Sequence, residues 1–266
     1  MSWLGQLAID KLVLFTLIFT RMSGLVITAP IYGKQQIPTQ VRVLLAFTLT
    51  VLILPSQLAH VVPPPGTTLN YLVLVGGELL IGLCLGLGID ILFSGAQLAG
   101  QIIGRNSGET MSEIYDPSFG EDVPMLSQFL TQVSLAVFVT IGGHRLVMAG
   151  LLDTFQSIPP GTAGIPGGVA QALVVMVTQS FVLGIRAAAP ALVALLLGTV
   201  VVAIIGRTLP QMNVMAIGFS LNAVLSLMSI AFTLGAAAWL FQNQVPAALE
   251  TLLESLHASL RSSPLP

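Results

Sequence analysis

The chain has 266 residues, of which 55% are hydrophobic and only 8% are charged, and its formal net charge is −2. A mean hydropathy of +0.93 with so few charges excludes an ordinary water-soluble domain. It predicts an integral membrane protein or a subunit of a hydrophobic assembly. The acidic balance excludes a basic track for nucleic acid, and the single cysteine, Cys84, excludes a disulfide framework or a multi-cysteine metal site.

Apolar runs with helical periodicity predict an all-α fold, an integral membrane or assembly-embedded helical bundle with long, kinked hydrophobic helices. Several runs free of charge reach the ~20 residues that cross a hydrocarbon core. In chain order, the predicted helices are Leu12 to Tyr32, Gln40 to Val62, Leu69 to Ile103, Pro124 to Gly142, a shorter piece around Arg145 to Phe155, Val169 to Gly206, and Val214 to Gln242.

Three of these helices have unusual features. Arg21 interrupts the first apolar run, which favours a retained first helix over a cleaved signal peptide. The third helix would be ~52 Å long, well beyond a hydrocarbon core of ~30 Å, so we expect it to bend, break or leave the bilayer. The helix from Val169 carries Arg186 and Pro190 near its middle, where a proline favours a kink.

Charged residues inside the apolar runs are candidates for buried charge. They are Arg21, Glu78, Asp90, Arg186 and Arg207. A charge facing lipid costs at least ~2.5 kcal/mol, so these side chains should face protein or water. Glu78 and Asp90 lie about 120° apart around one helix axis, which gives no support to a paired-carboxylate mechanism. Structural pairing with an arginine is favoured over a proton or ion path.

Reactive constellations are missing from the sequence. It contains no HExxH, GxSxG, Walker or GxGxxG motif, and its three histidines are far apart. We therefore predict a protein that is not an enzyme and that holds no cofactor or metal.

Small residues recur at four-residue spacing, in Gly82 and Gly86 and again in Ala96, Gly100, Gly104 and Gly108. This spacing permits close packing of helix backbones. Glycine is also generally frequent in membrane helices, so the spacing alone leaves both interpretations open.

A polar segment runs from Gly104 to Val123 and differs from its apolar surroundings. It contains one arginine and five acids, a net charge of 1 − 5 = −4. Its length of about twenty residues is typical of a lid, plug or linker, and equally of a solvated connector.

At the C-terminus, leucines at offsets 0, 3, 4, 7 and 11 predict an amphipathic helix within residues 246–266.

An ordered set of motifs resembles the FliR family of flagellar type III secretion export-gate subunits, which is related to injectisome subunits of the SctT type. It begins with Arg21 and Gly24 and continues through Glu78, Gly82 and Gly86. Its most specific string contributes Arg207, Pro210, Gln211, Met212, Asn213 and Gly218. The chain departs from the family where Ser220 and Asn222 replace a common proline and lysine.

The resemblance implies a bacterial inner-membrane subunit of the flagellar basal body that assembles with FliP and FliQ homologues into a gated channel for unfolded flagellar proteins. It implies a FliP-like part in residues 1–165, a FliQ-like hairpin in 166–245 and a tail in 246–266, for which we expect FlhB as a partner. The implied pore plug consists of Gly104, Arg105, Asn106, Ser107, Gly108, Glu109, Thr110, Met111, Ser112, Glu113, Ile114, Tyr115, Asp116 and Pro117. The alternatives are an injectisome gate subunit and, with Arg21, Glu78, Asp90 and Arg186 as a midplane site, a stand-alone secondary transporter.

Overall fold

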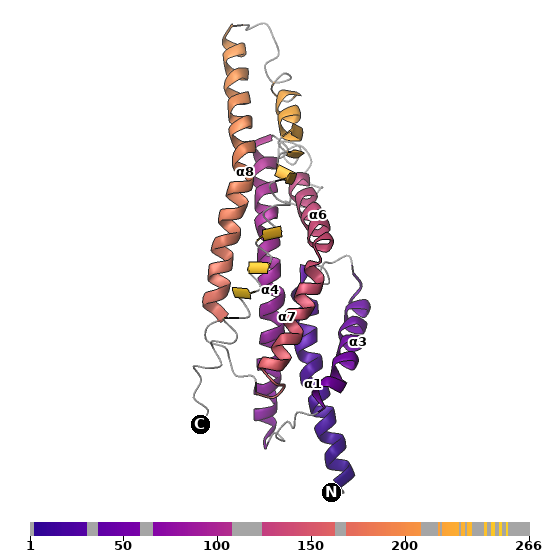
Figure 1. Ribbon diagram of the computed structural model, residues 1–266. Helices are drawn as coiled ribbons and strands as arrows, with labels where there is room; N and C mark the ends of the chain where they lie inside the picture. The colour runs from indigo at the N-terminus through magenta and orange to yellow at the C-terminus, as the bar shows by residue number, and fades with distance from the viewer. Residues whose placement is uncertain are drawn as a thin grey trace. The chain divides into compact units, whose positions relative to one another are not determined.

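The computed structural model describes residues 3–30, 37–58, 66–107, 124–162 and 169–208, with shorter stretches between 218 and 254. Every regular element among these residues is an α-helix (Figure 1). The helices are α1 (Trp3–Thr28), α3 (Thr39–Gln57), α4 (Thr68–Ser107), α6 (Met125–Thr140), α7 (Gly143–Ser157) and α8 (Val169–Thr208). The prediction of an all-α bundle is confirmed.

Among the described residues, four helices are long and apolar enough to cross a membrane. These candidate spans are Ile9–Thr28 of α1, all of α3 and α4, and Leu173–Thr208 of α8. The pair α6 and α7 makes a fifth if the two count as one broken span. Gly142, between them, has a φ of 77°, a left-handed conformation that favours glycine.

The predicted third helix does not break, because α4 continues over 40 residues, about 60 Å at 1.5 Å per residue. Helix α8 also has 40 residues and continues through Pro190. A proline inside a helix removes one backbone hydrogen bond, but the other bonds of a long helix hold its two sides together. Both helices therefore exceed the thickness of a hydrocarbon core.

Contacts divide the chain into two compact units. The first contains residues 1–90, 142–176 and 245–266, and the second contains residues 91–141 and 177–244. Helices α4 and α8 each contribute residues to both units. The boundary expected near residue 165 separates a part that resembles FliP from a part that resembles FliQ. It is a prediction about family resemblance, and a division by contacts does not test it.

In the first unit, α1, α7 and the first part of α4 run side by side (Figure 1). Their facing side chains form an apolar core of Leu17, Ile18, Met22, Leu25, Ile81, Leu85, Leu151 and Phe155. A Cβ on Gly24 would lie 2.8 Å from the Leu79 oxygen, and one on Gly82 would collide with the Arg21 oxygen. Helices α1 and α4 therefore pack backbone to backbone.

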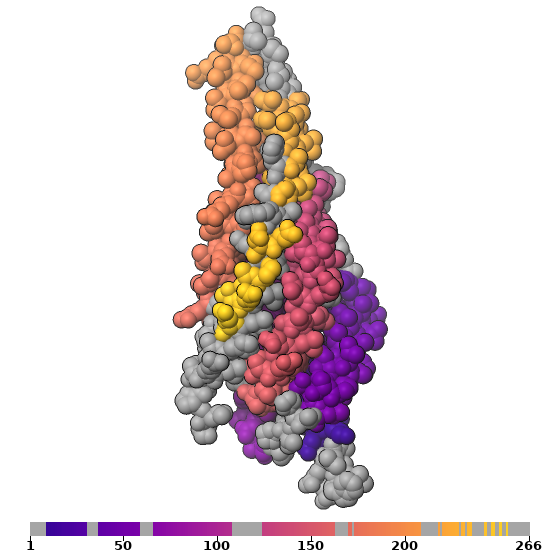
Figure 2. Space-filling model, viewed as in Figure 1, coloured from indigo at the N-terminus to yellow at the C-terminus, as the bar shows by residue number. Residues whose placement is uncertain are grey.

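Helix α3 contacts its unit along one narrow stripe, formed by Ala46, Thr50, Ile53 and Gln57. The ring of Phe47 lies edge-on to Phe15 of α1, with 5.7 Å between centroids. Most of its other apolar side chains are exposed, as are many on α8. Figure 2 shows α3 in violet and α8 in orange, each with long stretches at the visible surface. A membrane or other protein chains must cover such faces.

In the second unit, small residues hold α4, α6 and α8 close together. Ser127 at the start of α6 donates from Oγ to the Gln97 oxygen at 2.9 Å, and a Cβ on Gly100 would collide with the Ser127 backbone. Ser180 of α8 donates to the Ile91 oxygen of α4 at 2.5 Å. The core here consists of Ala99, Ile103, Leu130, Ala187, Ala188, Ala191 and Leu195. The packing interpretation of the glycine spacing is thus confirmed at Gly82, Gly86 and Gly100.

Candidate functional site

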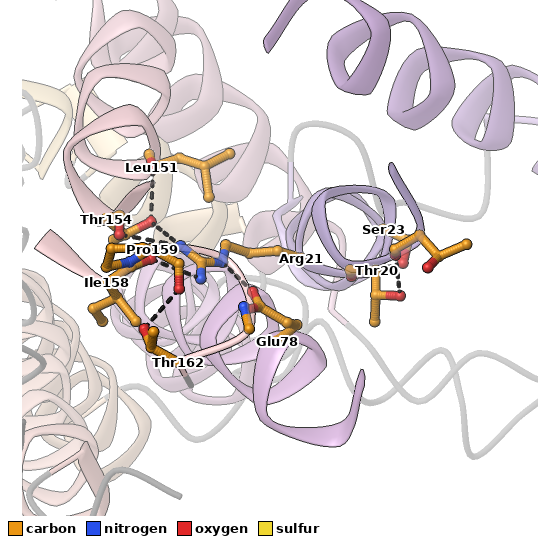
Figure 3. Close-up of polar contacts among 11 residues, drawn as sticks. Thr20, Arg21, Ser23, Glu78, Leu151, Thr154, Ile158, Pro159 and Thr162 are labelled. Atoms are coloured by element: carbon orange, nitrogen blue, oxygen red, sulfur yellow. Dashed lines mark hydrogen bonds and ion pairs between the residues drawn. The ribbon is translucent and has the colours of Figure 1, made fainter. Parts of the chain in front are cut away.

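Helices α1, α4 and α7 bring one cation and one anion together inside the first unit (Figure 3). Arg21 Nε of α1 donates to Glu78 Oε2 of α4 at 2.6 Å, and both side chains have 0% exposure. Their approach depends on Gly82, whose missing Cβ lets α4 lie against the backbone of Arg21. The sequence singled out both residues, and the structure pairs them with each other.

The rest of the guanidinium contacts the end of α7. Nη1 donates to the Thr154 backbone oxygen at 3.1 Å and to Thr154 Oγ1 at 3.3 Å. Nη2 donates to the Ile158 oxygen at 3.1 Å. The carbon centre of the guanidinium lies 4.3 Å from the centroid of the Phe155 ring, a cation–π contact that is strongest where water is excluded.

The second oxygen of the carboxylate contacts the turn that follows α7. Glu78 Oε1 accepts a hydrogen bond from the Gly161 N–H at 3.0 Å. Gly161 has a φ of 87°, which favours glycine. Thr162 closes the same turn by donating from its N–H to the Pro159 oxygen at 3.1 Å and from Oγ1 to that oxygen at 2.7 Å (Figure 3).

Through these contacts, α1, α4, α7 and the turn after α7 all bond to one ion pair, whose two charges sum to zero. Breaking a buried ion pair by removing one partner typically costs about 3–5 kcal/mol, since a buried charge is left uncompensated. The pair has no exposed surface on either side chain. The arrangement is therefore suited to holding backbone segments in place and not to exchanging a proton or ion with solvent.

The other charged candidates lie elsewhere. Asp90 is exposed and lies twelve residues beyond Glu78 on α4, about 18 Å along the axis. Arg186 and Arg207, both on α8, are also exposed. Asp90 is therefore too far along the helix to join the Arg21–Glu78 pair.

The predicted plug segment is described only at its beginning. Gly104, Arg105, Asn106 and Ser107 are not loop residues but belong to the end of α4, where Asn106 Nδ2 donates to the Ile102 oxygen at 2.7 Å. Helix α4 continues past Gly104 because a single glycine costs a helix only about 1 kcal/mol. The remaining plug candidates, Gly108 to Pro117, lie outside the described residues.

The family motif is also described only in part. Arg207 lies in the last turn of α8. Gly218 is half-buried, and a Cβ there would be 3.5 Å from Val202 Cγ1. Pro210, Gln211, Met212 and Asn213 lie outside the described residues, as do the leucines of the C-terminal amphipathic pattern.

Sequence reasoning missed Thr154, Phe155 and Gly161. Two of the groups that Arg21 contacts are backbone carbonyls, which no residue type reveals. Gly161 offers one signal in the sequence, its place in the Pro159-Pro160-Gly161 run, but such a run is typical of any separator between helices and does not indicate a contact with Glu78.

Comparison with known proteins gives one consistent result. The family model described as "Bacterial export proteins, family 1" matches residues 12–248. The chain is similar to the flagellar biosynthetic protein FliR of Bacillus subtilis, with 27% identity over 92% of this chain and 95% of that protein. It is also similar to FliR of Escherichia coli, with 30% identity over 76% of this chain and 77% of that protein, and to FliR of Aquifex aeolicus, with 28% identity over 85% and 86%.

Proposed function

Since the chain belongs to family 1 of the bacterial export proteins, we propose that it is a non-enzymatic membrane subunit of the flagellar protein-export gate. The observation that carries this function is the collinear match to FliR proteins, which extends over 92% of this chain in the Bacillus subtilis comparison. A match of that extent includes the helices of both units, so the resemblance is not confined to one motif.

We further propose that the subunit assembles with FliP and FliQ homologues in the bacterial inner membrane, at the flagellar basal body, into a channel for unfolded flagellar proteins. Two features support an assembly. The exposed faces of α3 and α8 are apolar over most of their lengths. Both α4 and α8 are about 60 Å long, twice the thickness of a hydrocarbon core, so part of each must be covered by something other than lipid tails.

The experiment is a clean deletion of the gene in the source bacterium, complemented from a plasmid. We expect loss of swimming and of secreted filament protein, with both restored by the intact gene. A deletion strain that swims and secretes normally would contradict the flagellar function. Retained swimming with loss of a virulence-type secretion activity would instead assign the chain to an injectisome gate, the alternative within the same family.

The described structure disfavours a stand-alone transporter. That hypothesis places Arg21, Glu78, Asp90 and Arg186 in one midplane site. Arg21 and Glu78 are instead closed from solvent and bonded to α7 and the turn after it, and Asp90 lies about 18 Å further along α4. Its test is function without other subunits. Transport by the purified chain alone in vesicles would favour the transporter over the gate.

We also propose that the tail in residues 246–266 contacts FlhB. An amphipathic helix with few basic residues suits a protein surface better than an anionic membrane. Deletion of residues 246–266 should lower the amount of FlhB that co-purifies with the chain. Undiminished co-purification would rule out this contact.

A further inference from the structure

We propose that Arg21 and Glu78 form a directional clamp that positions the backbone leaving α7, residues 158–161, and do not merely neutralise each other. The clamp is defined here as the Arg21–Glu78 pair with its bonds to Thr154, Ile158 and Gly161. Its two residues are positioning residues, since they act through the chain segment that they hold.

Arg21 provides a positive charge that the last turn of α7 lacks. The end of a helix leaves carbonyl groups without helical partners and carries about half a unit of negative charge, which a cation stabilises. The last turn of α7 contains no basic residue. Arg21 supplies that cation from α1, by donating to the Thr154 and Ile158 oxygens at 3.1 Å each.

The carboxylate of Glu78 binds a backbone N–H donor in the same segment, whereas Arg21 binds carbonyl acceptors. Three residues beyond Ile158, the N–H of Gly161 points to Glu78 Oε1 at 3.0 Å. The guanidinium therefore binds the carbonyl groups of the segment, and the carboxylate binds its amide group. Because each member of the pair fits only one backbone polarity, the two charges cannot be exchanged.

The same geometry requires an arginine. Its planar fork offers five N–H donors in fixed directions, whereas a lysine ammonium is a compact group on a flexible stem. In this site, the donors diverge to Glu78 on α4, Thr154 within α7 and Ile158 after it. A lysine would keep the charge but could not hold all three acceptors at once.

The clamp holds the chain shortly before Val169, where α8 begins. The connection between α7 and α8 contains the proposed boundary between the FliP-like and FliQ-like parts. The clamp would thus fix where the second part leaves the first, and this consequence alone rests on the proposed function.

The test is hydrogen–deuterium exchange of the full chain, purified with its export-apparatus partners. Ile158, Gly161 and Thr162 each donate a backbone N–H bond, whereas Pro159 and Pro160 have no N–H, so a peptide over residues 158–162 reports on the clamp. Two variants keep the total charge: Arg21→Lys, and the reversed pair Arg21→Glu with Glu78→Arg. The matched control is Arg186→Lys, because Arg186 is exposed on α8.

We expect both clamp variants to lose protection in residues 158–162 while residues 143–150 of α7 stay protected, and the control to match the wild type. Wild-type protection in Arg21→Lys or in the reversed pair would overturn the proposal, since charge neutrality would then suffice. If a variant also loses protection in residues 143–150, Glu78→Asp replaces it as the deciding variant. It keeps the charge but shortens the side chain by one carbon, so it cannot reach both Arg21 and the Gly161 N–H, and unchanged exchange in residues 158–162 would then overturn the clamp.

Swimming of the same strains separates this inference from the proposed function. The exchange protection of residues 158–162 reports on the clamp independently of the function of the protein. If the Arg21→Lys protein loses protection in residues 158–162 and deletion of the gene leaves swimming intact, the clamp is supported and the flagellar function is contradicted. Intact protection in Arg21→Lys, together with a non-swimming deletion strain, would do the reverse.

Discussion

Arg21 and Glu78 each have no exposed surface, so each is solvated by the other and by the backbone around it. Such a pair contributes little net stability compared with apolar side chains of the same volume, but removing one partner is costly. At the level of single residues, the first unit therefore depends on both charges being present or both absent.

Neutralising one member of the pair should destabilise the protein more than neutralising both. We expect Arg21→Met and Glu78→Gln each to lower the free energy of unfolding by about 3–5 kcal/mol. The double variant should lose less than the sum, since no uncompensated charge remains. A double-mutant cycle from denaturant titrations of the purified complex measures this coupling. Strictly additive losses would show that the two residues do not depend on each other.

A side chain at Gly161 should destabilise the protein. Its φ of 87° is unfavourable for other residues, so Gly161→Ala should lower the free energy of unfolding by about 1–2 kcal/mol. Gly66→Ala is the matched control, because a Cβ there meets nothing within 4 Å. Equal melting temperatures for the two variants would contradict the strained turn.

The sequence predicted these residues only individually. Arg21 and Glu78 stand out because ionisable groups are rare in apolar helices. Their pairing did not follow, since Glu78 had several arginines available and the choice depends on which helices pack together. The acceptors at Thr154 and Ile158 are backbone groups, and any residue could supply them.

At the level of helices, α1 and α4 touch through glycine. Spacing predicted this for Gly82 and Gly86 but left ordinary glycine richness as an alternative, because sequence does not reveal which face of a helix meets a neighbour. The positions of the described helices were predictable from apolar periodicity. Their ends were not: α1 begins at Trp3 and α4 extends to Ser107. Asp10 and Lys11 in α1, and the polar residues after Gly104 in α4, interrupt the apolar run but continue the helix.

Two glycine-to-alanine substitutions on α4 distinguish the energetic effect of helix packing from that of helix propensity. Gly82→Ala should force α1 and α4 apart and cost about 1–3 kcal/mol, because its Cβ would collide with the Arg21 backbone. Gly76→Ala should be neutral or stabilising by up to about 1 kcal/mol, since a Cβ at Gly76 meets nothing within 4 Å and alanine favours helix. Thermal denaturation of both variants measures the contrast. A stable Gly82→Ala variant would contradict close packing at this crossing.

At the level of the whole molecule, the exposed apolar surfaces of α3 and α8 are the main sign of an assembly. Composition predicted a hydrophobic protein, but it could not distinguish surfaces that face lipid from those that face other chains. A surface of either kind can be apolar, so the two are distinguished only in the assembled complex.

The polar segment that starts in the last turn of α4 gives a prediction about the assembled channel. If residues 104–123 include the plug, deleting residues 107–122 should increase the leakage of small solutes through the membrane, because an obstruction has been removed. Conductance of the reconstituted complex measures this, with the intact complex as control. Unchanged conductance would contradict the plug assignment.

We propose that this chain works as one subunit of a multi-protein gate. The decisive measurement is native mass spectrometry of the tagged chain, expressed with and without the FliP and FliQ homologues of the same genome. We expect a single copy of this chain in a stable complex with both partners. A stable monomer or homodimer that ignores both partners would contradict it.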